Sequence, residues 1–119
     1  MKRIEIITGV QYDANGNELT QEAVAETLIR VKTFLAGRYG GITVYSGTGS
    51  WCEPIAGLVV TRLVTEPNLT FVILGSLTVQ DGVRIADYVR DQFGQTCVTL
   101  TITEAEGGLV YAGGRVEQI

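Results

Sequence analysis

The stretch GRYGGITVYSGTGSWCEPIAGLVVTRLVTE, residues 37–66, departs from the regular patterns that flank it on both sides. It holds several of the fifteen glycines, the only tryptophan, one of the two cysteines and the isolated carboxylates Glu53 and Glu66. Glycines around an aromatic ring and a carboxylate suit a place where the backbone approaches a ligand closely. A long β-hairpin whose turns require glycine is the structural alternative. The pattern alone leaves both interpretations open.

Within and just after this stretch, the pattern predicts short strands separated by turns. The Gly47–Ser50 segment interrupts one apolar run. Pro67 disfavours helical geometry for the residue before it, so we expect a turn over 65–68 that contains Glu66. The continuous apolar character of the last run is typical of a central strand. The strands predicted here are 41–45, 58–64 and 69–74.

Outside the stretch the helix and strand patterns are more regular. Apolar residues recur at helical spacing between the candidate N-cap Thr20 and the candidate stop Gly37. Thr78 or Ser76 can cap a second amphipathic helix, which ends at Gly94. The remaining predicted strands are 3–12, 97–103 and 109–112, with a polar tail after the last.

The predicted order is therefore β-α-β-β-α-β with an extra hairpin strand at the end. This order predicts an α+β fold of the ferredoxin-like type, in which two helices cover one face of an antiparallel sheet. At 119 residues, the chain is long enough for one core, so we expect a single domain over 1–119.

The predicted strands carry more apolar residues than one helix-covered face requires. An uncovered apolar face is buried in a second copy of the chain, so we expect a homo-oligomer in which sheets pack together. By analogy with the PII-like proteins, we expect a homotrimer. The residues on which this expectation rests are Val44, Ile55, Val59, Val60, Leu63, Val72 and Leu109.

Composition excludes several classes of function. The net charge is −4 and the nine basic residues are scattered, which argues against a nucleic-acid partner. No apolar run approaches the ~20 residues of a membrane span, and 1–10 has the pattern of a strand and not of a signal peptide. The sequence contains no histidine, which removes the usual metal sites and histidine-based catalysis. We expect no metal and no cofactor; the chemistry is left to carboxylates, Tyr, Lys and backbone groups.

Three separated segments carry a resemblance to a known family: GRYGG (37–41), TGSWCE (48–53) and TCVTLTITEAEGGLVYAGG (96–114). In their order and spacing they resemble the bacteriophage enzymes that degrade S-adenosylmethionine (SAM), called SAM hydrolases and later SAM lyases. The resemblance covers roughly residues 37–114.

The resemblance implies a trimer of ferredoxin-like subunits that binds SAM between neighbours. It also implies a phage protein in the host cytoplasm that destroys the methyl donor and so blunts methylation-dependent restriction. The implied reaction is intramolecular: the substrate's own carboxylate attacks its γ-carbon, which gives 5′-methylthioadenosine and L-homoserine lactone.

The resemblance also implies site residues. In the family, a glutamate just before the central strand is the critical acid, and Glu66 matches that position, with Glu53 as an alternative. Trp51 stands where the family usually has tyrosine; it can stack on the adenine or lie near the sulfonium, or belong to the core. The other candidate substrate-binding residues are Tyr39, Glu104, Glu106, Gly108 and Tyr111. Each has an ordinary structural alternative as a surface, turn or core residue.

Two other interpretations compete with a lyase. A non-catalytic PII-like trimer can bind a nucleotide-like molecule between its subunits, as a signal sponge or a sensor. Such a protein needs basic residues near the cleft to meet phosphates, and the chain offers mainly Arg38, Arg62 and Arg115. The segment GRYGGITVYSGTGSW (37–51) also resembles a family of small, often exported bacterial proteins of unknown function, for which only a fold would follow.

Overall fold

The computed structural model describes residues 1–59 and 61–118. The chain folds in the predicted order, β-α-β-β-α-β followed by a C-terminal hairpin. The elements are β1 (Lys2–Gly9), α1 (Gln21–Tyr39), β2 (Thr43–Pro54), β3 (Thr61–Gly75), α2 (Val79–Gln92), β4 (Thr99–Glu104), β5 (Gly108–Val110) and β6 (Val116–Gln118).

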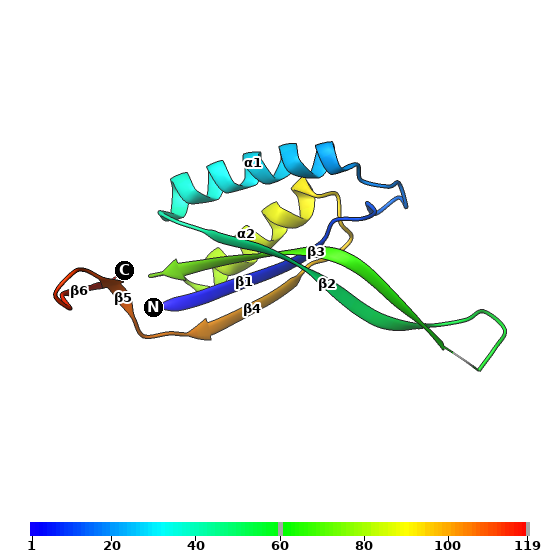
Figure 1. The fold of residues 1–119 in the computed structure, drawn as a ribbon. Helices are drawn as coiled ribbons and strands as arrows, with labels where there is room; N and C mark the ends of the chain where they lie inside the picture. The colour runs from blue at the N-terminus through cyan, green and yellow to red at the C-terminus, as the bar shows by residue number, and fades with distance from the viewer. Residues whose placement is uncertain (60, 119) are drawn as a thin grey trace.

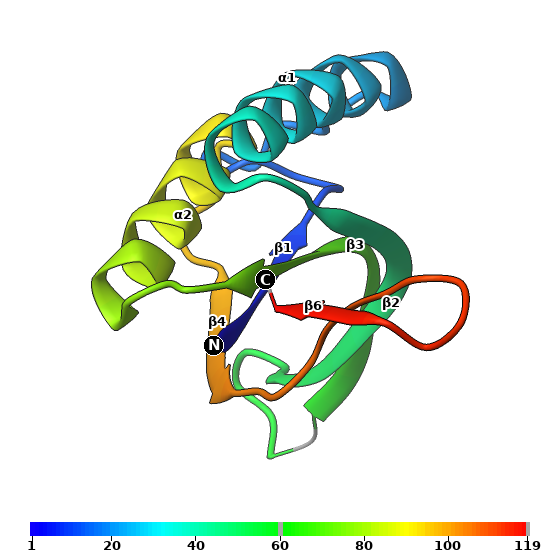
Figure 2. The ribbon, with the colours of Figure 1, turned by 90° about the vertical axis from the view of Figure 1, so that its left-hand side faces the viewer.

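Four of the strands form one antiparallel sheet in the order β2-β3-β1-β4. Both helices lie on one face of this sheet, above β1 and β3 in Figure 1. Figure 2 shows the same two layers from one end. The predicted α+β class and the central position of the 69–74 run, now part of β3, are confirmed. No helix in the described part of the chain is long and apolar enough to cross a membrane.

The core lies between the helices and the sheet. Alternate residues of neighbouring strands pair across it, with Ile4 opposite Ile73 and Ile6 opposite Phe71. The helices contribute apolar side chains such as Val31 and Leu35 of α1 and Ile85 and Val89 of α2, all buried. Because side chains alternate along a strand, the residues between these point to the other side of the sheet. We call that side, which the helices do not cover, the open face.

The helix ends follow local capping chemistry. Thr20 caps α1 as predicted, accepting a hydrogen bond from the Ala23 N–H at 3.1 Å. The helix passes through Gly37, however, and ends only at Gly40, which adopts φ +91° and donates its N–H to the Ala36 carbonyl at 2.9 Å. The predicted stop at Gly37 is wrong, because a left-handed residue and not glycine alone terminates a helix.

The long hairpin formed by β2 and β3 replaces the predicted short strands. β2 runs unbroken through Gly47 and Gly49, and β3 runs unbroken through Glu66 and Pro67. The predicted break at 47–50 and turn at 65–68 are therefore wrong. β3 tolerates Pro67 because the Pro67 carbonyl faces the β1 side, where it accepts the Val10 N–H at 3.3 Å just beyond the end of β1. The Pro67 nitrogen faces the β1 side as well, so the missing N–H of proline removes no backbone hydrogen bond to β2.

Not all of the expected surplus of apolar residues lies on the open face. Val44 packs against the core on the helix side, because it pairs with Phe71. Val60 lies outside the described residues. Val72 does lie on the open face. The four others, Ile55, Val59, Leu63 and Leu109, are exposed in the β2–β3 hairpin and in β5.

The chain ends in a second, two-stranded sheet. β5 pairs with β6 in antiparallel register, so the predicted polar tail is in fact a strand. In Figure 1 this hairpin lies at one end of the molecule, and the tip of the β2–β3 hairpin lies at the other. The longest extent of the chain is 61 Å, against 31 and 28 Å in the other directions.

Candidate functional site

Three glycines of neighbouring strands meet on the open face. Asn68 in β3 pairs with Gly9 on one side and with Gly47 on the other, and Glu66 pairs with Gly49. Residues paired across a sheet share a face. The residues paired with Glu66 and Asn68 therefore have no side chains, and we call Gly9, Gly47 and Gly49 the glycine floor.

These glycines provide space and not backbone freedom. None of the three has a positive φ, so their extended backbone would accept other residues. An added Cβ would lie 3.0 Å from Glu66 Oε1 at Gly9 and 3.1 Å from Asn68 Nδ2 at Gly49. Glycine inside a strand weakens it and often marks a close approach to a ligand or to another backbone. Here the floor gives the Glu66 and Asn68 side chains room to lie across the neighbouring strands.

In the described part of the chain, no side chain pairs with the Glu66 carboxylate. Glu66 and Asn68 are half-buried, and within 1–59 and 61–118 neither side chain forms a hydrogen bond or an ion pair. Glu53 differs, because it accepts a hydrogen bond at 2.6 Å from Nε of Arg62, the residue opposite it in the hairpin. Of the two candidate acids, Glu66 is the one whose oxygens remain free for a cationic ligand.

Gln95 approaches the same place from the end of α2. Its side-chain Nε2 donates to the carbonyls of Tyr12 at 2.7 Å and Phe93 at 3.0 Å. These bonds fix the amide, and its Oε1 lies 3.3 Å from where a Cβ on Gly9 would be. Neither Gln95 nor Gly9 is predicted as a site residue from the sequence, since nothing in the local pattern connects position 95 with strand β1.

Trp51 lies on the open face of the same hairpin, opposite Val64. Its side chain is 44% exposed, which excludes a position in the core of the single chain. Two steps along β2 from the Gly49–Glu66 pair, the indole borders the surface that contains Glu66. Trp51 and Glu66 are thus brought to one face, as a shared site requires.

The other predicted residues lie at the opposite end of the molecule, where Glu104 and Tyr111 already have partners. Lys2 forms an ion pair with Glu104 and donates a hydrogen bond to its carboxylate. This hydrogen bond is the main cause that holds the pKa of the Glu104 carboxyl below its ordinary range. The Tyr111 hydroxyl donates to Glu117 Oε2 at 3.0 Å. A Cβ on Gly108 would lie 2.2 Å from the Glu117 carbonyl oxygen, so Gly108 is required for β5–β6 pairing.

A groove of about 410 Å³ opens at that same end. Tyr39, although its ring also packs against the core, lines it together with Leu109 of β5 and the open-face residues Thr43, Val72 and Leu74. Glu106 lies in a separate cavity beside Met1 and Gln118. Six residues of extended strand, about 20 Å, separate Val72 from Glu66. A single chain therefore does not bring the two groups of predicted site residues together.

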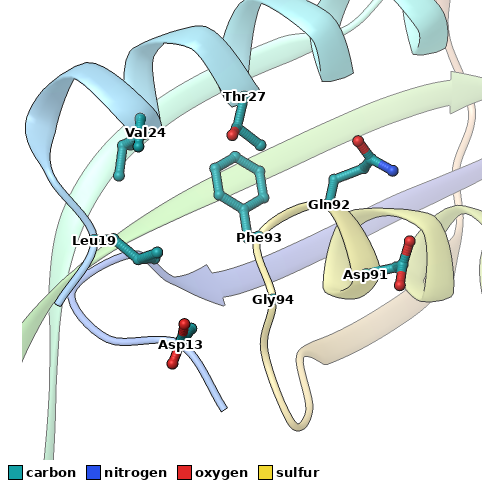
Figure 3. A pocket seen from close by; sticks show the side chains of 9 residues that line it. Asp13, Leu19, Val24, Thr27, Asp91, Gln92, Phe93 and Gly94 are labelled. Atoms are coloured by element: carbon teal, nitrogen blue, oxygen red, sulfur yellow. The ribbon is translucent and has the colours of Figure 1, made fainter. Parts of the chain in front are cut away.

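A third hollow, of about 170 Å³, lies between the start of α1 and the end of α2. Figure 3 shows Phe93 at its centre, with Asp13 and Leu19 below and Val24 and Thr27 above. The Asp13 carboxylate is occupied, because it accepts the N–H groups of Asn17 and Asn15, and the Asn17 bond is the main cause of its lowered pKa. This hollow is too small for a nucleoside. Among the described residues, no three acidic or cysteine side chains gather as metal ligands.

No protein-family model matches the chain, and no curated protein matches it in sequence. Solved structures do match. A phage SAM lyase in complex with S-methyl-5′-thioadenosine is 22% identical with a TM-score of 0.55, covering 87% of this chain and 80% of its own.

Other similar structures belong to different classes of protein. The B. subtilis GlnK–ATP complex is 16% identical with a TM-score of 0.54, covering 96% of this chain and 91% of its own. The CutA protein of Archaeoglobus fulgidus is 12% identical with a TM-score of 0.54, covering 92% and 88%. At these identities the likeness concerns the fold. The chain has the ferredoxin-like, PII-like α+β fold that these proteins share.

Proposed function

We propose that this protein is a SAM lyase that cleaves SAM into 5′-methylthioadenosine and L-homoserine lactone. The observation that carries the proposal is Glu66, a half-buried carboxylate that has no side-chain partner among the residues described, set on the glycine floor of the open face. Such a group attracts the ammonium of a substrate. The structural likeness to a phage SAM lyase supports the same reaction.

The reaction needs little from the protein beyond orientation. A carboxylate oxygen of SAM attacks the γ-carbon, the carbon–sulfur bond breaks, and its electron pair stays on sulfur, which becomes the neutral thioether of methylthioadenosine. The new carbon–oxygen bond closes the lactone, and no proton is transferred. Holding the two groups in line contributes on the order of 7–11 kcal/mol. Exclusion of water favours this step further, because the negative carboxylate and the positive sulfonium of SAM both lose their charges, and charges are less stable away from water. A chain without histidine can perform this chemistry.

We propose that the complete site lies between two subunits of a homotrimer. The Glu66 end of one chain binds the amino acid part of SAM, and the groove around Tyr39 and Leu109 of its neighbour receives the adenosine. The exposed Trp51 ring supplies a stacking surface at the junction. We assign Glu104 and Glu106, at the same end of the neighbour, as the proposed contacts to the ribose. In an infected cell, such an enzyme in the cytoplasm would deplete the methyl donor and counter restriction.

A nucleotide sponge or sensor receives less support from the side chains, although a GlnK–ATP complex shares the fold. Phosphate binding needs free basic groups. Arg62 is paired with Glu53, and Arg115 lies 3.9 Å from Glu117 and 4.0 Å above the Tyr111 ring. Arg38 lies 5.8 Å from the ring centre of Tyr39.

The test is to incubate the purified protein with SAM, without added metal, and to follow methylthioadenosine and homoserine lactone by chromatography. We expect both products from the wild type, a loss of at least about a hundredfold in rate for Glu66→Gln, and a nearly unchanged rate for Glu53→Gln. Intact SAM would rule out the lyase. Loss of activity in Glu53→Gln with retention in Glu66→Gln would reverse the assignment of the acid.

A further inference from the structure

Two hydrogen-bond acceptors converge over Gly9. The place that a Cβ on Gly9 would occupy is 3.0 Å from Glu66 Oε1 and 3.3 Å from Gln95 Oε1. Because Gly9 has no side chain, the space above its Cα is open, and a ligand group in van der Waals contact with Gly9 can face both oxygens. A positive group with several hydrogen-bond donors fits this arrangement.

The hydrogen bonds of Gln95 establish that its free atom is an acceptor. Nε2 already donates to the Tyr12 and Phe93 carbonyls, so Oε1 is the part of the amide left to face Gly9. An ammonium group has three donors and no acceptor. One ammonium can therefore donate to Glu66 and to Gln95 together, and the carboxylate supplies the opposite charge.

The Asn68 amide lies on the β2 side of Glu66 and offers both a donor and an acceptor. Its Nδ2, the donor, lies 3.1 Å from where a Cβ on Gly49 would be, and Gly49 is the residue paired with Glu66; its Oδ1, the acceptor, lies 3.2 Å from where a Cβ on Gly47 would be. Same-face neighbours on a strand, such as Glu66 and Asn68, are about 7 Å apart. Acceptors on one side and a donor on the other match an α-amino acid head group, whose ammonium and carboxylate are one carbon apart.

A neutral donor suits a carboxylate that must act as a nucleophile. A cationic partner would stabilise its charge before reaction, and that stabilisation is lost as the charge disappears in the transition state. The arginines on the open face of β1 and β3 are already paired, Arg3 with Glu5 and Arg62 with Glu53. Asn68 is the group that remains to orient the carboxylate.

We propose, on the basis of the proposed function, that Gln95 and Asn68 are further substrate-binding residues: Gln95 shares the substrate ammonium with Glu66 above Gly9, and Asn68 binds the carboxylate. The experiment measures binding by calorimetry for three ligands. S-adenosylhomocysteine carries the whole head group and has an uncharged sulfur, which is a poor leaving group. Of the head group, decarboxylated SAM keeps only the ammonium, and it retains the sulfonium; methylthioadenosine has neither the ammonium nor the carboxylate.

Two variants separate the two contacts without removing the bonds that hold Gln95. Gly9→Ala places a methyl group between the two acceptors, and its extended backbone accepts alanine. Asn68→Leu removes the donor at nearly constant volume. Each lost bond to a charged group weakens binding about ten- to a hundredfold. We expect Gly9→Ala to weaken the binding of S-adenosylhomocysteine and decarboxylated SAM. Asn68→Leu should weaken the binding of S-adenosylhomocysteine alone. Both variants should bind methylthioadenosine as the wild type does.

The outcomes separate this inference from the proposed function. If the wild type binds none of the three ligands, the lyase and this inference fail together. If the wild type binds the ligands but either variant loses as much affinity for methylthioadenosine as for S-adenosylhomocysteine, the residues are structural and the inference alone is overturned. Equal loss of decarboxylated SAM and S-adenosylhomocysteine in Asn68→Leu would likewise exclude Asn68 as the carboxylate ligand.

Discussion

A glycine in a strand can serve backbone conformation or leave space for a neighbouring group, and Gly49 allows these two roles to be tested separately. Its φ is not positive, and β-branched residues are favoured in strands, so Gly49→Val is compatible with the backbone of β2. The new side chain would nevertheless stand on the glycine floor, where even a Cβ lies 3.1 Å from Asn68 Nδ2. We predict that Gly49→Val keeps or raises the melting temperature and lowers SAM cleavage at least about tenfold, since one blocked contact costs this much.

The matched control is Thr48→Val, one residue earlier on the opposite face of the hairpin. Thr48 is exposed and pairs with Pro67, and valine has nearly its shape. Its melting temperature and activity should both stay near those of the wild type. Equal activity in the two valine variants would mean that the glycine floor has no part in the site.

The sequence could indicate the acid of the candidate site but not its setting. Glu66 was expected in a turn, because Pro67 follows it, and β3 instead carries both residues in an extended strand. The alternation of Gly47 and Gly49 places both on one face of a strand, but only if β2 is known to continue through them. Gly9 and Gln95 join the site through strand pairing and through the end of α2, which local sequence does not specify.

At the scale of elements, α2 begins with a capping box that depends on charge. Asp81 accepts the Thr78 backbone N–H at 2.8 Å, and Thr78 Oγ1 accepts the Asp81 N–H at 3.1 Å. The Thr78 backbone bond is the main cause of the lowered pKa of Asp81, whose ordinary value is 3.8. A carboxyl whose pKa is lower in the folded state stabilises that state above the unfolded pKa, and the stabilisation disappears as pH falls through the folded pKa.

We therefore predict that Asp81→Asn melts below the wild type at pH 7, and that the difference shrinks as the pH is lowered below 3.8. Thermal denaturation followed by circular dichroism measures it. Asp91→Asn, near the C-terminal end of the same helix, serves as the control and should not lower the melting temperature at pH 7, because a negative charge there opposes the helix dipole. A constant difference at all pH values would show that the charge of Asp81 does not matter.

Elements were predictable where local chemistry decides them. Thr20 caps α1 as predicted, and of the two candidate caps of α2, Thr78 and Ser76, the structure has Thr78. The strands of the β2–β3 hairpin were predicted too short, because Gly47–Ser50 and Pro67 are turn signals on their own. Pairing overrides them: each is held opposite a partner in the neighbouring strand. β6 was missed because a short, exposed strand has no apolar pattern.

At the scale of the whole molecule, length is the feature that bears on function. The chain is 61 Å long and carries the free Glu66 near one end of the sheet and the 410 Å³ groove near the other. No motion within a single sheet brings these ends together, because they are fixed on the same strand, β3. Head-to-tail contacts in a closed ring place unlike ends of neighbouring chains side by side. A ring of subunits would therefore complete the proposed site, whose two halves lie apart on each single chain.

This arrangement predicts that two inactive variants restore each other. Glu66→Gln damages the carboxylate end, and Leu109→Glu introduces a charge at the groove, where Leu109 is 51% exposed and so tolerates substitution. Each variant alone should be inactive, while light scattering should still give about three times the 12.8 kDa of one chain. After mixing at equal concentration, unfolding and refolding together, we expect about a quarter of the wild-type rate of SAM cleavage, because every mixed trimer has one site built from two intact halves.

The fraction recovered distinguishes the possible arrangements. If each site lay within one chain, every site would contain one of the two substitutions and the mixture would stay inactive. The control for refolding is the wild type taken through the same treatment. A second mixture combines Glu66→Gln with the double variant Glu66→Gln,Leu109→Glu. It should recover no activity, since neither chain has an intact carboxylate end. Recovery in the first mixture but not in the second requires that Glu66 of one chain works with Leu109 of another. A monomeric mass in solution, or an inactive first mixture, would contradict the intersubunit site.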